Sequence, residues 1–148
     1  MSSRAMSSKS TYSFGLLEKC IRLRIYAGAG SWATPFLAAG RGINTNNAAF
    51  GVPDGAGAAG AVTRLSAGKF QITLDDAYLK LVTAQATYAG SGDAEDLVAQ
   101  VGLIGNLGTS TPTTVIVKTK TGAVNTDPGT TDANTFIAVD LVFEDSAA

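Results

Sequence analysis

The chain contains no histidine and only one cysteine, Cys20, among its 148 residues. Without histidine, Ser-His-Asp and Cys-His catalysis and the commonest transition-metal ligand are excluded. A single cysteine allows neither an intrachain disulfide nor a cysteine-rich zinc site, so we expect Cys20 to be a small buried hydrophobic residue. No apolar run is long enough for a transmembrane helix, and the first residues lack the apolar core of a secretory signal.

Charged residues are also scarce, at 16% of the chain against about 25% in an average soluble protein. This composition fits a protein covered by partners, and equally a small Thr- and Gly-rich β domain with neutral loops. The few charges are unevenly placed: residues 1–24 hold five basic and one acidic residue, whereas residues 25–148 hold six basic and eleven acidic ones. The asymmetry predicts a basic N-terminal arm that meets an acidic surface, with too few bases for nucleic-acid binding.

Carboxylates are the only remaining candidates for acid–base or metal chemistry. Asp75 and Asp76 are adjacent, and Asp93, Glu95 and Asp96 lie close together. Adjacent carboxylates on a strand point apart, and paired aspartates between two β segments are typical of a turn. The second group lacks the spacing of an EF-hand loop. The sequence therefore predicts no catalytic residue and no metal ligand, and we expect a protein that is not an enzyme.

The segment Gly55–Gly60, GAGAAG, matches the dinucleotide-binding pattern G-x-G-x-x-G. That motif works only between a strand and a helix, whose N-terminus meets the pyrophosphate. Here a β-like segment follows the glycines, so we interpret the match as a result of composition and predict no cofactor.

The clearest structural pattern is Lys69–Tyr88, in which apolar and polar residues alternate, an acidic corner follows, and a second β segment ends the stretch. Similar patterns occur at 20–26, 61–66, 97–104, 114–121 and 135–144. They predict an all-β fold, an antiparallel sandwich or barrel of about seven strands, with an extended N-terminal arm and a long Gly/Ala-rich loop. Within 97–104, one face is expected to carry Leu97, Ala99, Val101 and Leu103.

The segment Cys20–Tyr26 alternates three aliphatic residues with Arg22 and Arg24 on the opposite face. We expect a strand with two outward arginines to lie at a sheet edge, to face an acidic partner, or to be exchanged between copies. The following residues 27–60 are more than half Ala and Gly and show no strand or helix period. Their aromatic residues predict either docking onto a neighbouring subunit or a lid over the domain's own core, and both remain open.

These patterns divide the chain into an arm (1–19), an edge strand with a Gly/Ala-rich interaction loop (20–60) and a β domain (61–148). Aromatic and basic residues of the first two parts are the types that dominate protein interfaces. The predicted interface residues are Arg4, Lys9, Tyr12, Phe14, Arg22, Arg24, Trp32, Phe36 and Phe50.

Four segments taken in order, GKFQITLDDAYLKLVTAQATY, DLVAQVG, TVIVKTKTGAV with Asp127-Pro128, and FIAVDLVFEDSAA, resemble a group of small virion proteins of tailed bacteriophages. The resemblance covers about residues 62–146 and rests on β pattern and turn residues. It implies a non-enzymatic structural role, and the expected one is a capsid decoration (cement) protein that stabilises the outer shell through its arm and loop.

The same resemblance implies the partners: the major capsid protein and further copies of this chain, with a trimer as the expected oligomer. No nucleic acid, membrane or small-molecule substrate is expected, and the implied location is the virion, assembled in the host cytoplasm. One alternative is a tail, neck or fibre-base component of the virion. Another is a carbohydrate-binding β-sandwich module, for which Tyr78 and Tyr88 would have to lie exposed on one strand face.

Overall fold

A computed structural model describes residues 18–39, 62–74, 77–90, 96–132 and 134–144, and every regular element in them is a β-strand. The predicted interface residues Arg4, Lys9, Tyr12, Phe14 and Phe50, the Asp75-Asp76 corner and the glycine motif at 55–60 lie outside the described residues. The strands are β1 (Glu18–Gly28), β2 (Ser31–Ala39), β3 (Val62–Ser66), β4 (Lys69–Thr73), β5 (Lys80–Ala89), β6 (Leu97–Gly105), β7 (Thr114–Thr121), β8 (Val124–Asn125) and β9 (Phe136–Glu144).

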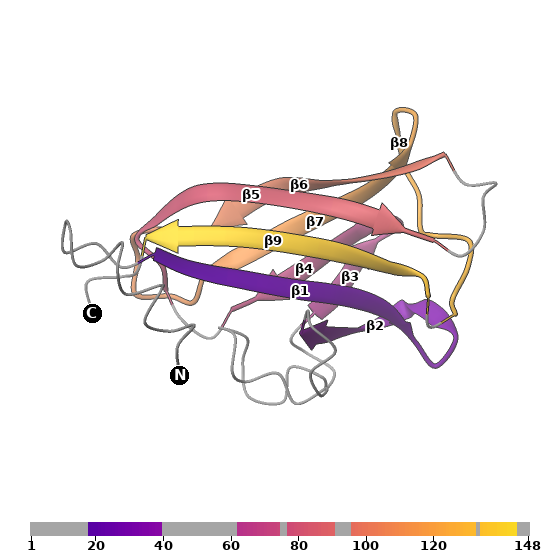
Figure 1. The fold of residues 1–148 in the computed structure, drawn as a ribbon, viewed down its shortest axis with the longest axis horizontal. Helices are drawn as coiled ribbons and strands as arrows, with labels where there is room; N and C mark the ends of the chain where they lie inside the picture. The colour runs from indigo at the N-terminus through magenta and orange to yellow at the C-terminus, as the bar shows by residue number, and fades with distance from the viewer. Residues whose placement is uncertain (1–17, 40–61, 75–76, 91–95, 133, 145–148) are drawn as a thin grey trace, which may run out of the picture.

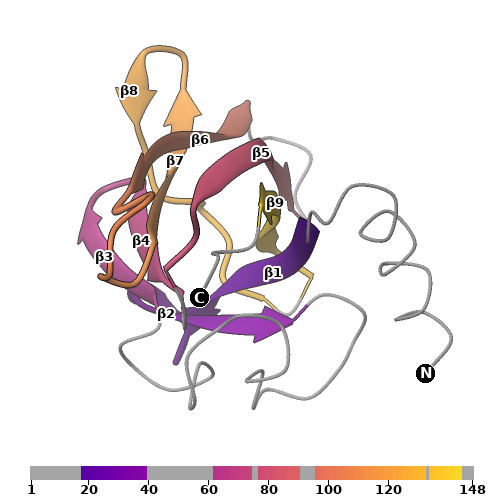
Figure 2. The same ribbon diagram turned by 90° about the vertical axis from the view of Figure 1, so that its left-hand side faces the viewer.

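The strands form two antiparallel sheets that pack face to face (Figure 1). Sheet A has the order β2-β1-β9-β5, and sheet B has the order β3-β4-β7-β6, with β8 paired to the end of β7. At the margins β2 lies beside β3 and β5 beside β6, so the two sheets make a flattened barrel (Figure 2). The short β7–β8 hairpin projects from the body in both views. The predicted all-β sandwich is confirmed.

Period-two alternation fills the core from both sheets. In β9 the residues Ile137, Val139, Leu141 and Phe143 are fully buried while the alternating positions are half-buried. The predicted inward faces of the first strand and of residues 70–74 are likewise buried. Tyr78, just before β5, stacks on Phe143 with ring centroids 4.5 Å apart. The two sheets therefore share one hydrophobic core.

β1 is an interior strand of sheet A, which corrects the expectation of an edge strand. It pairs with β2 on one side and along its length with β9 on the other. Its apolar residues belong to the same core as those of the strands after residue 61. The boundary expected at residue 60 therefore does not separate two packing units among the described strands.

β2 was not predicted, because its residues are mostly small and include Pro35. It is an edge strand of sheet A, where a proline that lacks an N–H is tolerated. Ile25 pairs with Leu37 and Tyr26 with Phe36, after which a bulge shifts the register toward the turn. Tertiary pairing with β1 thus makes a strand of a segment whose own pattern is weak.

A bulge in β6 overturns the predicted placement of Leu103. Val101 pairs with Val117 on the core side, but the next paired residue is Leu103, opposite Ile116 on the outer side. Gly102 is the extra residue, and Leu103 is 59% exposed. One inserted residue moves every later side chain to the other face.

Two further expectations are wrong. Cys20 is exposed, because it lies on the outer face of sheet A, opposite Val142 of β9, and not on the aliphatic face of β1. Tyr78 and Tyr88 do not form an exposed pair on one strand: Tyr78 precedes β5 and is fully buried, and Tyr88 packs half-buried against the core.

Candidate interaction surface

The outer face of sheet A is built from cross-strand rows that run over all four strands. Phe36, Tyr26 and Phe136 belong to one row, since Tyr26 pairs with Phe36 and the neighbouring Ile25 pairs with Ile137. Arg24 and Ala138 are paired in the next row. Because these positions alternate with the buried ones, their side chains point away from the core.

We call Arg24, Tyr26, Phe36 and Phe136 the aromatic cluster. The rings of Tyr26 and Phe36 stack with centroids 5.5 Å apart and an interplanar angle of 18°, and the Tyr26 and Phe136 centroids are 5.6 Å apart. The guanidinium carbon of Arg24 lies 4.5 Å from the centroid of the Phe136 ring, a cation–π contact. All four side chains are half-buried. These mutual contacts give the cluster a defined shape on the sheet surface.

Beyond the aromatic cluster, the same face carries two ion pairs in register. Arg22 Nε lies 3.3 Å from Asp140 Oδ1, and Lys80 Nζ lies 3.3 Å from Glu144 Oε1. The two residues of each pair face one another on adjacent strands. Since these pairs are largely exposed, each contributes little to stability. Their effect is to neutralise this part of the face. The acidic group that faces Arg22, which the sequence led us to expect on a partner, is Asp140 of the same chain.

Trp32 belongs to the core and not to the aromatic cluster. Only 4% of it is exposed, its ring lies 5.6 Å from that of Phe70 across the sandwich, and its indole Nε1 donates a 2.8 Å hydrogen bond to the carbonyl of Thr130. Of the two alternatives left open for the aromatic residues of 27–60, the structure supports packing on the domain's own core for Trp32. Phe36, four residues later on the same strand, points outward.

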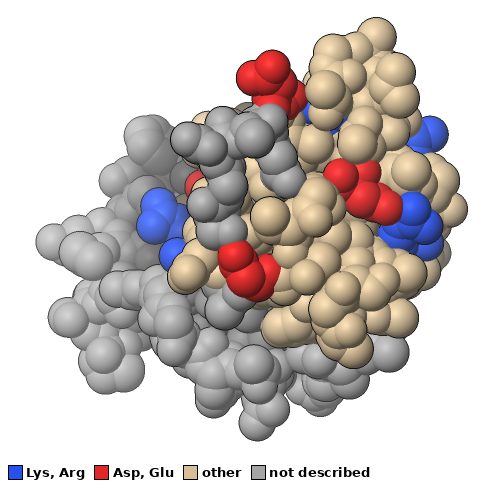
Figure 3. Space-filling model, turned by 90° about the vertical axis from the view of Figure 1, so that its right-hand side faces the viewer, with Lys and Arg blue, Asp and Glu red and all other residues tan. Residues whose placement is uncertain are grey.

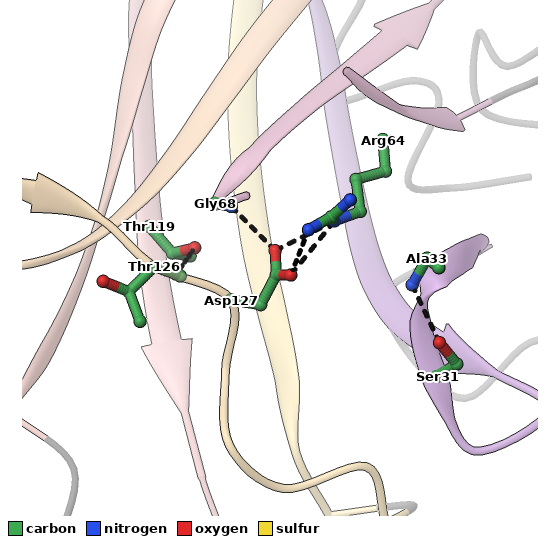
Figure 4. A network of polar contacts seen from close by, with 7 residues as sticks. All are labelled: Ser31, Ala33, Arg64, Gly68, Thr119, Thr126 and Asp127. Carbon is green, nitrogen blue, oxygen red and sulfur yellow. Dashed lines mark hydrogen bonds and ion pairs between the residues drawn. The ribbon is translucent and has the colours of Figure 1, made fainter. Parts of the chain in front are cut away.

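The segment after β8 is fixed by a polar network (Figure 4). Arg64 of β3 donates through Nη2 and Nε to the carboxylate of Asp127, at 2.6 and 3.0 Å to Oδ2, and the amide of Gly68 donates to Asp127 Oδ1 at 2.7 Å. The hydroxyl of Thr119, buried in β7, donates to the carbonyl of Thr126 at 2.6 Å. Together with the bond from Trp32, these contacts hold the segment that leads into β9.

Two opposing effects set the pKa of Asp127. Partial burial would raise it, but the hydrogen bonds from Arg64 and Gly68 and the positive charge of Arg64 outweigh burial, so the pKa lies below the ordinary aspartate value. The pKa of Arg64 is raised, chiefly by its hydrogen bond to Asp127. Each partner keeps the other charged, and we interpret the pair as a structural link between β3 and the β8–β9 connection.

Within the described residues, no group of three or more His, Cys, Asp or Glu side chains could hold a metal ion. At the end of the sandwich drawn in Figure 3, the acidic side chains stand in separate groups, and one of these groups lies directly beside basic side chains. The described part of the chain also has no helix long and apolar enough to cross a bilayer.

Three of the predicted interface residues that can be placed, Arg22, Arg24 and Phe36, share the outer face of sheet A. Trp32 does not. The sequence analysis did not include Tyr26 and Phe136, although both had a usable signal. Tyr26 shares the outward face of β1 with the two arginines, and Phe136 shares the outward face of β9 with Asp140. The alternation within each strand does not reveal that β1 and β9 are neighbours in the sheet.

Comparison of the chain with protein-family models, with curated proteins and with solved structures found no match.

Proposed function

We propose that this chain is a non-enzymatic structural protein of a tailed-bacteriophage virion, and that it binds the outer shell of the capsid as a decoration protein. The observation that carries the proposal is the aromatic cluster on the outer face of sheet A. Aromatic residues and arginine are enriched at protein–protein interfaces and dominate their binding energy. The resemblance of residues 62–146 to small phage virion proteins supports the choice of partner.

The geometry suits attachment to a rigid surface. The rings and the guanidinium group constrain one another, so little side-chain entropy remains to be lost when a partner covers them. The rest of the face is neutralised by its own ion pairs, which lowers the cost of removing it from water. A single patch of this size gives modest affinity, and the proposed oligomer would multiply it through avidity.

A tail, neck or fibre-base position in the virion is the alternative within the same class, because such a component would use the same face at a different site. A carbohydrate-binding module has less support. Stacking on a sugar uses flat ring faces turned to solvent. Tyr26 and Phe36 instead turn one face toward each other, and Arg24 covers one face of Phe136, so less flat ring surface is left for a sugar.

The test is binding of the purified chain to particles assembled without it. The double variant Arg24→Gln, Phe36→Ala should keep its fold, because both side chains lie outside the core. Its Kd for the particles should be at least tenfold higher. This corresponds to a loss of about 1.4 kcal/mol or more of binding free energy, as expected when hot-spot residues are removed. Ser110→Ala, in the exposed turn between β6 and β7, is the control and should bind like the original chain. Equal binding by all three proteins would remove the aromatic cluster from the interface.

A further inference from the structure

The outer face of sheet B differs in chemistry from that of sheet A. One cross-strand row joins Lys69 of β4, Lys118 of β7 and Gln100 of β6, and the next joins Lys120 with Val98. A third row joins Gln71, Ile116 and Leu103. The face therefore presents three lysines among uncharged polar and aliphatic side chains.

These lysines have no acidic counterparts on their own sheet. The described strands of sheet B contain no Asp or Glu. Their only other basic residue, Arg64, is neutralised by Asp127. Among the described residues, Lys69, Lys118 and Lys120 take part in no ion pair, in contrast to Lys80 and Arg22 on sheet A. The described part of the chain therefore supplies no counter-charge for these three lysines.

The arrangement of the lysines is unfavourable for the isolated chain. Lys69 and Lys118 lie directly opposite each other on adjacent strands, and like charges in this position destabilise a sheet. The Lys118 side chain lies over Gly102, where an added Cβ would come within 2.7 Å of Cε and 3.1 Å of Cδ. The missing Cβ of Gly102 thus leaves room for the aliphatic part of Lys118 against the sheet. A lysine that packs its stem in this way can still keep its ammonium group in solvent.

Apolar side chains flank the lysines. Val98 is 63% exposed and Leu103, placed outward by the bulge, is 59% exposed. Exposed aliphatic residues next to lysines without ion-pair partners suit a protein as the binding partner. Burial of the aliphatic residues then adds to the charge attraction. Nucleic-acid surfaces add arginine or aromatic stacking residues to lysine, and the outward positions of sheet B carry neither.

We propose that the outer face of sheet B, centred on Lys69, Lys118 and Lys120, is a second docking surface and that its occupant is an acidic protein surface. Charge complementarity would relieve the opposition of Lys69 and Lys118, and Val98 and Leu103 would be covered at the same time. The proposal does not depend on the role of the aromatic cluster. If both faces bind, the chain is a bridge, with the aromatic cluster and the lysine face on opposite sides of the sandwich.

The probe is a short synthetic peptide in which Glu alternates with Leu, and its counterpart with Gln in place of Glu. In amide-resolved NMR titrations of the full chain, the acidic peptide should shift residues of β4, β6 and β7 and leave β1 and β9 unchanged, with weaker binding at higher salt. The triple variant Lys69→Gln, Lys118→Gln, Lys120→Gln should bind about tenfold more weakly, as three exposed ion pairs would predict. Lys80→Gln is the control with unchanged affinity.

The triple variant removes a like-charge contact, so its melting temperature should equal or exceed that of the original chain. The map of shifts on the original chain stands independently of any variant. Shifts absent from β4, β6 and β7, equal binding by the triple variant, or equal binding of the Gln peptide would each overturn the proposal. Tighter binding of a short DNA duplex to the same face would overturn the choice of a protein as occupant.

Discussion

Arg64 and Asp127 form a two-point ion pair that joins β3 to the segment between β8 and β9, with Nη2–Oδ2 and Nε–Oδ2 distances of 2.6 and 3.0 Å. Both side chains are less than a third exposed. Because the pair is sheltered and its carboxylate also accepts the Gly68 amide, it should contribute more than an ordinary surface salt bridge.

Asp127→Asn should therefore lower the free energy of unfolding by about 2 kcal/mol at neutral pH, the range for hydrogen bonds to charged groups. The neutral amide keeps the shape of the carboxylate but leaves Arg64 without its counter-charge. Urea denaturation monitored by Trp32 fluorescence measures the change. Asp96→Asn, at an exposed position just before β6, is the control and should change stability by no more than about 0.5 kcal/mol. Equal losses in the two variants would refute the assigned role of the pair.

The same pair predicts a pH dependence. The pKa of Asp127 is lower in the folded chain than its ordinary value of about 3.9. Its contribution is therefore fully present above about pH 4 and is lost as pH falls through the lower folded value. The stability difference between the original chain and Asp127→Asn should stay constant from neutral pH to about pH 5 and shrink below pH 4. A difference that grows on acidification has the wrong sign for this explanation.

Gly68 and Gly122 provide a matched comparison, because both have a left-handed backbone, with φ of 61° and 59°. At Gly68 an added Cβ would meet backbone atoms, the amide of Thr126 and the carbonyl of Thr119 at 2.5 Å, whereas at Gly122 nothing lies within 4 Å. Gly122→Ala should lower the free energy of unfolding only by the backbone strain, about 1 kcal/mol, whereas Gly68→Ala should lower it by about 3 kcal/mol or more. Thermal unfolding of the two variants measures both losses. Similar losses would mean that the packing of the β3–β4 turn against Thr119 and Thr126 adds nothing.

Trp32→Ala should lower the free energy of unfolding by about 3–5 kcal/mol, the usual cost of removing a buried aromatic side chain. Trp32→Phe keeps most of the packing against Phe70 but leaves the Thr130 carbonyl without its donor, so about 2 kcal/mol is expected. Phe36→Ala, on the outer face of the same strand, should cost less than either. If Trp32→Ala left the chain as stable as before, the ring would have to be an interface residue after all.

The strands that the sequence predicted well are those in which inward and outward positions alternate without interruption. Ile137, Val139, Leu141 and Phe143 show an unbroken alternation, and all four are buried. Residues 70–74 and the aliphatic residues of β1 behave in the same way. Burial of every second residue is a local pattern, so it can be recognised from the sequence of one strand without knowing which strands lie beside it.

The failures all involve information that is not local. Leu103 faces outward because Gly102 is bulged, and the bulge is defined only by pairing with β7. β2 exists because β1 offers it a pairing partner, and the central position of β1 depends on the long connection back to β9. For the candidate surface, the sequence indicated Arg24 and Phe36, but their contact with Tyr26 and Phe136 required the strand order.

The most direct test of the proposed role is quantitative mass spectrometry of virus particles purified from a culture that produces this chain, with copies of the chain counted against the major capsid protein. We predict that the chain is present in a number comparable to that of the coat subunits, as a decoration protein must be. A small fixed number per particle would instead place it in the tail or neck. Absence from purified particles would contradict the proposal that this chain is a structural protein of the virion.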